Sequence, residues 1–161
     1  MRSRQLIPAV TLVLAVFFLS ACNENLVYEE NIKIEDASWE RKKAAQFSFM
    51  IDENQRAYDI YLNFRHSPKY PFSNLYLFIR TLKPGNQIAQ DTVQMLLADQ
   101  KGKWLGKGIG DLYDYQFKFK ERVILPDTGK YTIEIEQAMR QASLPYVTDI
   151  GVRVEKVKNE Q

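Results

Sequence analysis

Apolar and polar residues alternate over most of the chain beyond residue 45, and this period of two constrains the fold more than any other feature. The clearest run is residues 58–65, Tyr-Asp-Ile-Tyr-Leu-Asn-Phe-Arg, in which positions 58, 60, 62 and 64 are all apolar or aromatic. Successive side chains of a β-strand point to opposite faces, so this pattern indicates half-buried strands. We expect the core to include the inward positions Ile60, Leu62, Ile133, Ile135, Val152 and Val154.

Turn-forming sequences separate the alternating runs, as Lys83-Pro84-Gly85-Asn86 does with a Pro-Gly pair suited to a type II turn. We count about eight strands, near residues 27–34, 45–51, 57–66, 73–82, 89–98, 115–121, 130–137 and 147–156. No helical period lies between them. The spacing predicts an all-β fold, an antiparallel β-sandwich of jelly-roll or immunoglobulin-like topology.

Two segments depart from the simple alternation. Residues 75–79 are apolar or aromatic at every position, which predicts a central strand covered on both faces. Residues 137–142 are expected to form a single turn of helix. No internal repeat or second domain is visible along the chain.

The amino-terminal residues have the pattern of a secretory signal. A basic head, Met1–Arg4, precedes an apolar run over residues 6–19, which is shorter than the roughly 20 residues of a membrane span. The sequence Leu19-Ser20-Ala21-Cys22 is similar to a bacterial lipobox, in which the cysteine thiol takes a diacylglycerol. We expect a cleaved lipoprotein signal peptide (1–21), a lipid-anchored tether (22–30) and a β-sandwich domain (31–161).

The charge of the mature chain is balanced. Residues 1–21 hold two arginines and no acidic residue, so 20 basic and 20 acidic residues remain after cleavage. A net charge of zero gives no reason to expect a nucleic-acid partner. Cys22 is the only cysteine, which excludes a disulfide within the chain and leaves membrane lipid as its expected partner.

A glycine-rich stretch over residues 99–111 interrupts the strand pattern. Four glycines fall within nine residues, but they match neither the Rossmann spacing nor the P-loop spacing, so no nucleotide is expected. Glycine frees the backbone for close approach or positive φ, which suggests that the stretch has a specific use. We take it as a candidate interaction loop comprising Lys101, Lys103, Trp104 and Lys107, together with Tyr70 and Asn74.

Trp104 has two interpretations. With neighbouring tyrosines it can form an exposed aromatic patch that binds a protein or a sugar. Alternatively, it folds back and caps the open end of the sandwich. The sequence leaves both open.

The sequence provides no catalytic constellation. His66 is the only histidine and is expected in a loop after the strand at 57–66; nothing marks a serine nucleophile or a carboxylate pair. Asp99, Asp111 and Asp114 flank the glycine-rich stretch without the spacing of a calcium loop. We therefore expect no enzyme activity, no metal site and no cofactor.

Five blocks of sequence, in order, resemble the gliding-motility lipoprotein family GldH. The resemblance covers about residues 28–155, and the blocks are Tyr70–Leu77, Asp91-Thr92, Gly102–Gly108, Gly129–Tyr131 with Glu136–Arg140, and Asp149–Arg153. It implies a cell-envelope lipoprotein, at the outer membrane, that serves gliding motility and is associated with type IX protein secretion. It implies no catalytic residues.

Two classes of function follow from these observations. The first is a non-enzymatic envelope protein that contacts other proteins of the gliding or secretion machinery through its glycine-rich loop. The second is a glycan-binding module that uses the aromatic residues at the same end, an analogy drawn from β-sandwiches in general.

Overall fold

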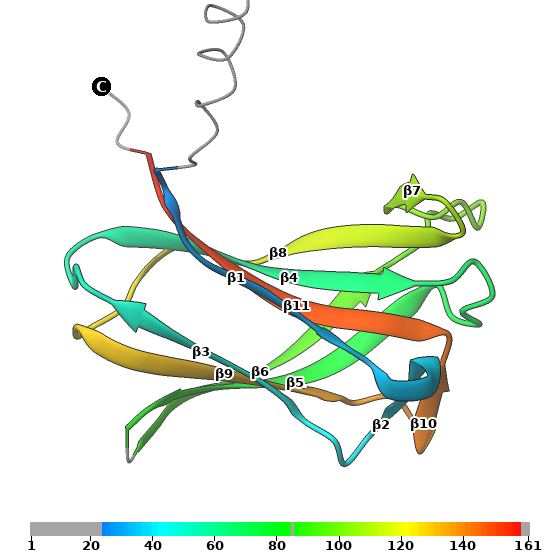
Figure 1. The fold of residues 1–161 in the computed structure, drawn as a ribbon, viewed down its shortest axis with the longest axis horizontal. Helices are drawn as coiled ribbons and strands as arrows, with labels where there is room; N and C mark the ends of the chain where they lie inside the picture. Colours follow the sequence, from blue (N-terminus) through cyan, green and yellow to red (C-terminus); the bar gives the residue numbers. More distant parts are fainter. Residues whose placement is uncertain (1–23, 85, 159–161) are drawn as a thin grey trace, which may run out of the picture.

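The computed structural model describes residues 24–84 and 86–158, so the expected signal peptide and Cys22 lie outside the described residues. Within them the chain forms eleven strands and one short 3₁₀ turn (Figure 1). The bounds are β1 (Leu26–Lys33), η1 (Glu35–Ala37), β2 (Ser38–Glu40), β3 (Ala45–Ile51), β4 (Ala57–His66), β5 (Asn74–Lys83), β6 (Asn86–Leu96), β7 (Lys107–Ile109), β8 (Leu112–Ile124), β9 (Gly129–Gln137), β10 (Ser143–Pro145) and β11 (Val147–Lys156).

Two antiparallel sheets form the sandwich. One has the strand order β1-β11-β4-β8-β7 and the other β3-β9-β5-β6, while β2 and β10 make a separate small ribbon. Eight of the strands are long, and they match the eight expected from sequence. The short strands β2, β7 and β10 were not expected, because three residues carry too little alternation to be recognised.

The long strands pair as a single hairpin that has been rolled up. Counted in chain order, strand one pairs with eight, two with seven, three with six and four with five. Further pairing of β11 with β4 and of β9 with β5 closes each sheet. This order is that of a jelly roll, which resolves the choice of topology left open by the sequence.

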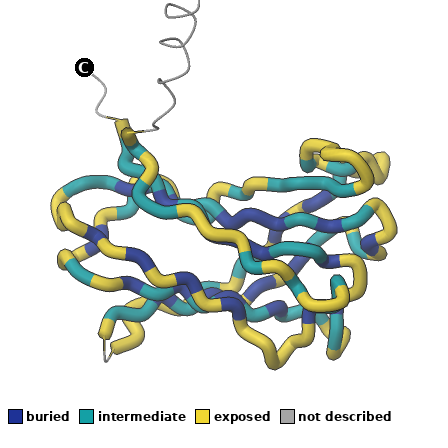
Figure 2. The backbone as a smooth tube through the Cα atoms, viewed as in Figure 1, coloured by how far each residue is buried: buried dark blue, intermediate teal, exposed yellow. Residues whose placement is uncertain are grey.

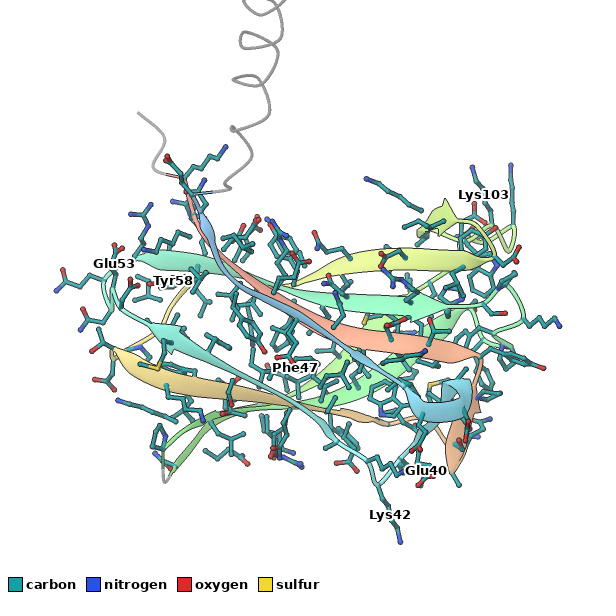
Figure 3. All side chains as sticks on the ribbon, viewed as in Figure 1. Glu40, Lys42, Phe47, Glu53, Tyr58 and Lys103 are labelled. Atoms are coloured by element: carbon teal, nitrogen blue, oxygen red, sulfur yellow. The ribbon has the colours of Figure 1, made fainter. Side chains whose placement is uncertain are left out.

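The core lies between the two sheets, as the burial along the backbone in Figure 2 indicates. The six expected core residues are all buried, which confirms the alternation from which they were predicted. Figure 3 shows Phe47 of β3 pointing between the layers, where it is fully buried. Neighbouring residues of β3 face solvent, in a strict alternation of buried and exposed positions.

Two expectations from the sequence are wrong. Residues 75–79 lie in β5, a central strand, but Tyr76 and Phe78 are exposed because no described segment forms a further layer over this face of the sheet. The expected helical turn at 137–142 is absent, since β9 continues through Gln137. The buried Gln137 side chain accepts a hydrogen bond from Met139 N at 2.9 Å and donates one to Gln141 O at 3.1 Å, which holds a non-helical bend.

The two ends of the described chain lie together. Leu26, at the start of β1, pairs with Glu155 near the end of β11, within the range that was expected to be a tether (Figure 1). The glycine-rich stretch lies at the other end of the long axis. No helix that could cross a membrane is found in the parts of the chain that the structure describes.

Candidate interaction loop

The glycine-rich stretch begins as a small hairpin between β6 and β7. Ala98 and Trp104 form an isolated bridge, and Leu105 N donates to Leu97 O at 2.8 Å. One carboxylate oxygen of Asp99 accepts the backbone N–H groups of Lys101 and Lys103, each at 2.9 Å. Asp99 therefore fixes the turn, as aspartate commonly does. Among the described residues, no group of three potential metal ligands occurs.

Trp104 packs inward against the end of the sandwich. Its ring is half-buried, with its centroid 4.5 Å from that of His66 in an edge-on arrangement and 5.9 Å from that of Tyr113. Edge-to-face pairs of this kind stabilise aromatic clusters beyond the area they bury. The geometry favours the interpretation of Trp104 as a cap.

His66 is the centre of this aromatic cluster rather than a loop residue, so the expectation from sequence is wrong. It is the last residue of β4 and is fully buried, with Nδ1 2.9 Å from Ser67 O. Its Nε2 has no hydrogen-bond partner among the described residues. Burial lowers the pKa of the His66 imidazole. Extending the alternation at 58, 60, 62 and 64 by one step would have placed residue 66 inside.

Tyr70 belongs to the aromatic cluster, and Asn74 is hydrogen-bonded to it. The Tyr70 ring is buried 5.4 Å from His66, and its hydroxyl donates to Asn74 O at 3.3 Å. Burial raises the pKa of the Tyr70 phenol. Asn74 is the half-buried first residue of β5. Neither residue is fully exposed, so neither belongs to the outer surface formed by the lysines.

The three lysines of the loop are exposed. Lys101 and Lys103 lie at the tip of the hairpin, and Lys107 begins β7, opposite Asp114 of β8. None of the three forms an ion pair among the described residues. Figure 3 shows Lys103 extending away from the body of the domain. The loop thus combines a rigid aromatic base with a positively charged rim.

The sequence model of the GldH lipoprotein family matches residues 26–154, from the first residue of β1 almost to the end of β11. The chain belongs to the GldH lipoprotein family. This membership confirms the resemblance noted in the sequence.

Two members of the GldH family are similar over nearly their whole length. The "Gliding motility lipoprotein GldH homolog" of Christiangramia forsetii is 30% identical over 91% of this chain and 94% of its own. The "Gliding motility lipoprotein GldH" of Flavobacterium johnsoniae is 28% identical over 90% of this chain and 94% of its own.

Among solved structures, a non-crystalline cellulose-specific carbohydrate-binding module, CBM28, aligns with 88% of this GldH family member and 78% of its own chain. The identity is 11% and the TM-score 0.40, so this likeness supports no inference about function.

Proposed function

We propose that this chain is a non-enzymatic lipoprotein of the outer membrane, acylated on Cys22, that acts in gliding motility and supports type IX protein secretion by binding another protein of that machinery. The observation that carries the proposal is the set of three exposed lysines without ion-pair partners among the described residues: Lys101 and Lys103 on the hairpin that Asp99 fixes, and Lys107 at the start of β7. Exposed charges held in place in this way favour association with an acidic partner surface.

The position of the loop relative to the anchor supports this role. Cys22 precedes Leu26 by four residues, so an acyl group on Cys22 ties the membrane to within about 14 Å of the start of β1. The loop lies beside the opposite end of β4, a ten-residue strand about 30 Å long. The two functions of the domain, anchoring and contact, are therefore separated along its length.

Glycan binding through the aromatic residues of the loop is the weaker alternative. Tyr70 is buried, and Trp104 is half-buried with its ring packed against His66 and Tyr113, so little ring surface is left for a sugar to stack upon.

The anchoring half of the proposal is tested at the lipobox. The change Cys22→Ser removes the thiol that accepts diacylglycerol, so the protein should lose metabolic labelling with palmitate and leave the membrane fraction. Two or more acyl chains hold a protein firmly at a bilayer, whereas one gives only marginal binding. Membrane retention and palmitate labelling of the Cys22→Ser protein would refute acylation at this residue.

The contact half is tested by reversing charge at the tip of the loop. Lys101→Glu with Lys103→Glu should impair colony spreading and secretion of type IX substrates in the native host. The melting temperature of the purified protein should stay within the error of the wild type, because both side chains are exposed. Crosslinking from position 103 in living cells should then identify the partner.

A matched control is available on other surfaces of the domain. Lys42 and Lys130 are also exposed and form no ion pair among the described residues, and Figure 3 shows Lys42 on the side of the domain away from Lys103. Lys42→Glu with Lys130→Glu should leave spreading and secretion intact. Wild-type behaviour of the Lys101/Lys103 variant, or equal damage by the control pair, would rule out the loop as a specific interface.

A further inference from the structure

A row of amide side chains crosses the outer face of the five-stranded sheet. Asn31 of β1, Gly151 of β11, Asn63 of β4 and Gln116 of β8 are register partners in succession. Asn63 Nδ2 donates to Asn31 Oδ1 at 3.1 Å, and Gln116 Nε2 donates to Asn63 Oδ1 at 3.0 Å. We call Asn31, Asn63 and Gln116 the amide row.

Gly151 makes this row possible. A Cβ atom at position 151 would lie 1.9 Å from Asn31 Oδ1 and 2.6 Å from Glu30 O, closer than any real side chain allows. The Asn31 side chain therefore lies across β11 in the space that glycine leaves. As a result Asn63 is only 7% exposed, although it belongs to the outer face of the sheet.

Each end of the amide row retains unused hydrogen-bonding capacity. Asn31 Nδ2 and Gln116 Oε1 make no hydrogen bond within the described residues, so the row offers a donor at one end and an acceptor at the other. A ligand that carries both hydrogen-bond donors and acceptors along its length suits this arrangement.

Carboxylates outnumber arginines around the row, four to two. The Arg65 guanidinium lies 2.9 Å from a carboxylate oxygen of Asp114 and 3.6 Å from one of Asp149. On the other side of the row, Arg153 pairs with Glu29 and Glu155. An anionic ligand would meet this excess of negative charge, whereas a neutral ligand would not.

The amide row and the charged residues around it form a floor, and a wall stands beside it. Residues 105–109 pass along the edge of β8, and Gly106 comes so close that an added Cβ would lie 2.9 Å from Asp114 O. Leu105 and Ile109 of the wall are 48% and 58% exposed. Floor and wall together enclose a groove of about 490 Å³, a volume typical of small-molecule sites.

We propose that this groove binds a neutral oligosaccharide. Each sugar hydroxyl is both a donor and an acceptor, which matches the free ends of the amide row, and the apolar C–H face of a sugar ring can lie against Leu105 and Ile109. An anionic ligand is disfavoured by the excess of carboxylates around the floor. The proposal does not rest on Lys101 or Lys103, which lie outside the groove, whereas Lys107 is part of its lining.

The test uses the full acylated protein in fluorescent liposomes applied to an array of neutral glucose, mannose, galactose and N-acetylglucosamine oligosaccharides. Many copies on one liposome make weak binding detectable. We expect the liposomes to be retained on at least one saccharide. Gln116→Ala and Asn63→Ala should each reduce this signal at least tenfold, because each removes a member of the amide row.

Two control variants show whether saccharide binding comes from the groove or from another surface of the protein. Gln94→Ala changes an exposed amide on the outer face of the other sheet and should bind as the wild type does. Lys101→Glu with Lys103→Glu should also bind normally, even where it abolishes spreading in cells. Circular dichroism and melting curves show whether Asn63→Ala is folded, and the exposed Gln116 provides a second variant that does not threaten the fold.

Three outcomes would overturn the proposal. The first is no retention on any neutral saccharide. The second is binding confined to sulfated or uronic-acid glycans, which would point to the lysines. The third is that the liposomes are retained on spots of unfolded polypeptide on the same array but on no saccharide spot. This result would assign the groove to a peptide ligand.

Discussion

His66 has an unusual position for a titratable residue. Its ring is packed among Phe64, Tyr70, Trp104 and Tyr113, with no charged side chain in the cluster to stabilise an imidazolium. Burial lowers its pKa below the ordinary value of 6.5, so the unfolded chain binds the proton more readily than the folded one. The folded state should thus lose stability as the pH falls through 6.5, until the pH lies below the folded pKa.

Replacing His66 by phenylalanine should remove this dependence. Phenylalanine fills a similar volume among aromatic neighbours and cannot be protonated. The melting temperature of the wild type should fall between neutral pH and about pH 5, where most carboxylates remain charged, and that of His66→Phe should change less. Because His66 is the only histidine, identical pH profiles of the two proteins would contradict the assignment.

At the scale of the element, β3 illustrates how the two faces of a strand differ. Phe47 is fully buried between the sheets, whereas the next residue, Ser48, is exposed and bonds to Thr132 of the neighbouring strand at 2.8 Å. The same chemical change at these adjacent positions should therefore have very different consequences.

Phe47→Asp should destabilise the protein by more than about 4 kcal/mol, because it opens a cavity and buries an unpaired carboxylate. That loss is comparable to the whole stability of a domain, so the variant should be largely unfolded. Ser48→Asp should change the free energy of unfolding by no more than about 1 kcal/mol. Urea denaturation measures both, and similar midpoints for the two variants would be incompatible with the assigned faces of β3.

Elements with long alternation could be predicted from sequence, and those set by tertiary contacts could not. The eight long strands were expected from the sequence, and the six expected core residues of β4, β9 and β11 follow from the period of two. The exposure of Tyr76 and Phe78 depends on whether another layer covers β5, which no local pattern specifies. The amide row joins residues 31, 63, 116 and 151, which only the rolled topology brings into one line.

The candidate loop was predicted in part. Its glycines, lysines and tryptophan are contiguous and were visible as a break in the alternation. The inward packing of Trp104 depends on His66 and Tyr113, which lie on two other strands, so the choice between cap and exposed patch required the fold.

At the scale of the whole molecule, β11 completes the five-stranded sheet. It lies between β1 and β4 and pairs with both, although it is the last strand of the chain. Its buried side chains, including Ile150, Val152 and Val154, also contribute to the core. The domain therefore cannot close until its final strand is available.

A chain truncated after Tyr146 should fail to fold, because β1 loses its only partner in the sheet and β4 loses one of two. Its circular dichroism spectrum should lack the β signal, and it should show no cooperative thermal transition. A chain truncated after Lys158, beyond the end of β11, should melt as the full-length protein does. A cooperative transition in the shorter chain would show that β11 is dispensable.

The pairing of β1 with β11 also determines how the domain responds to mechanical force. If the chain is held through a lipid near Leu26 and pulled at the loop, the tension runs along the axis of β1. The hydrogen bonds between β1 and β11 lie across that axis, so they are loaded together in shear rather than broken one after another. A domain attached in this way would resist extension through the whole of its first strand.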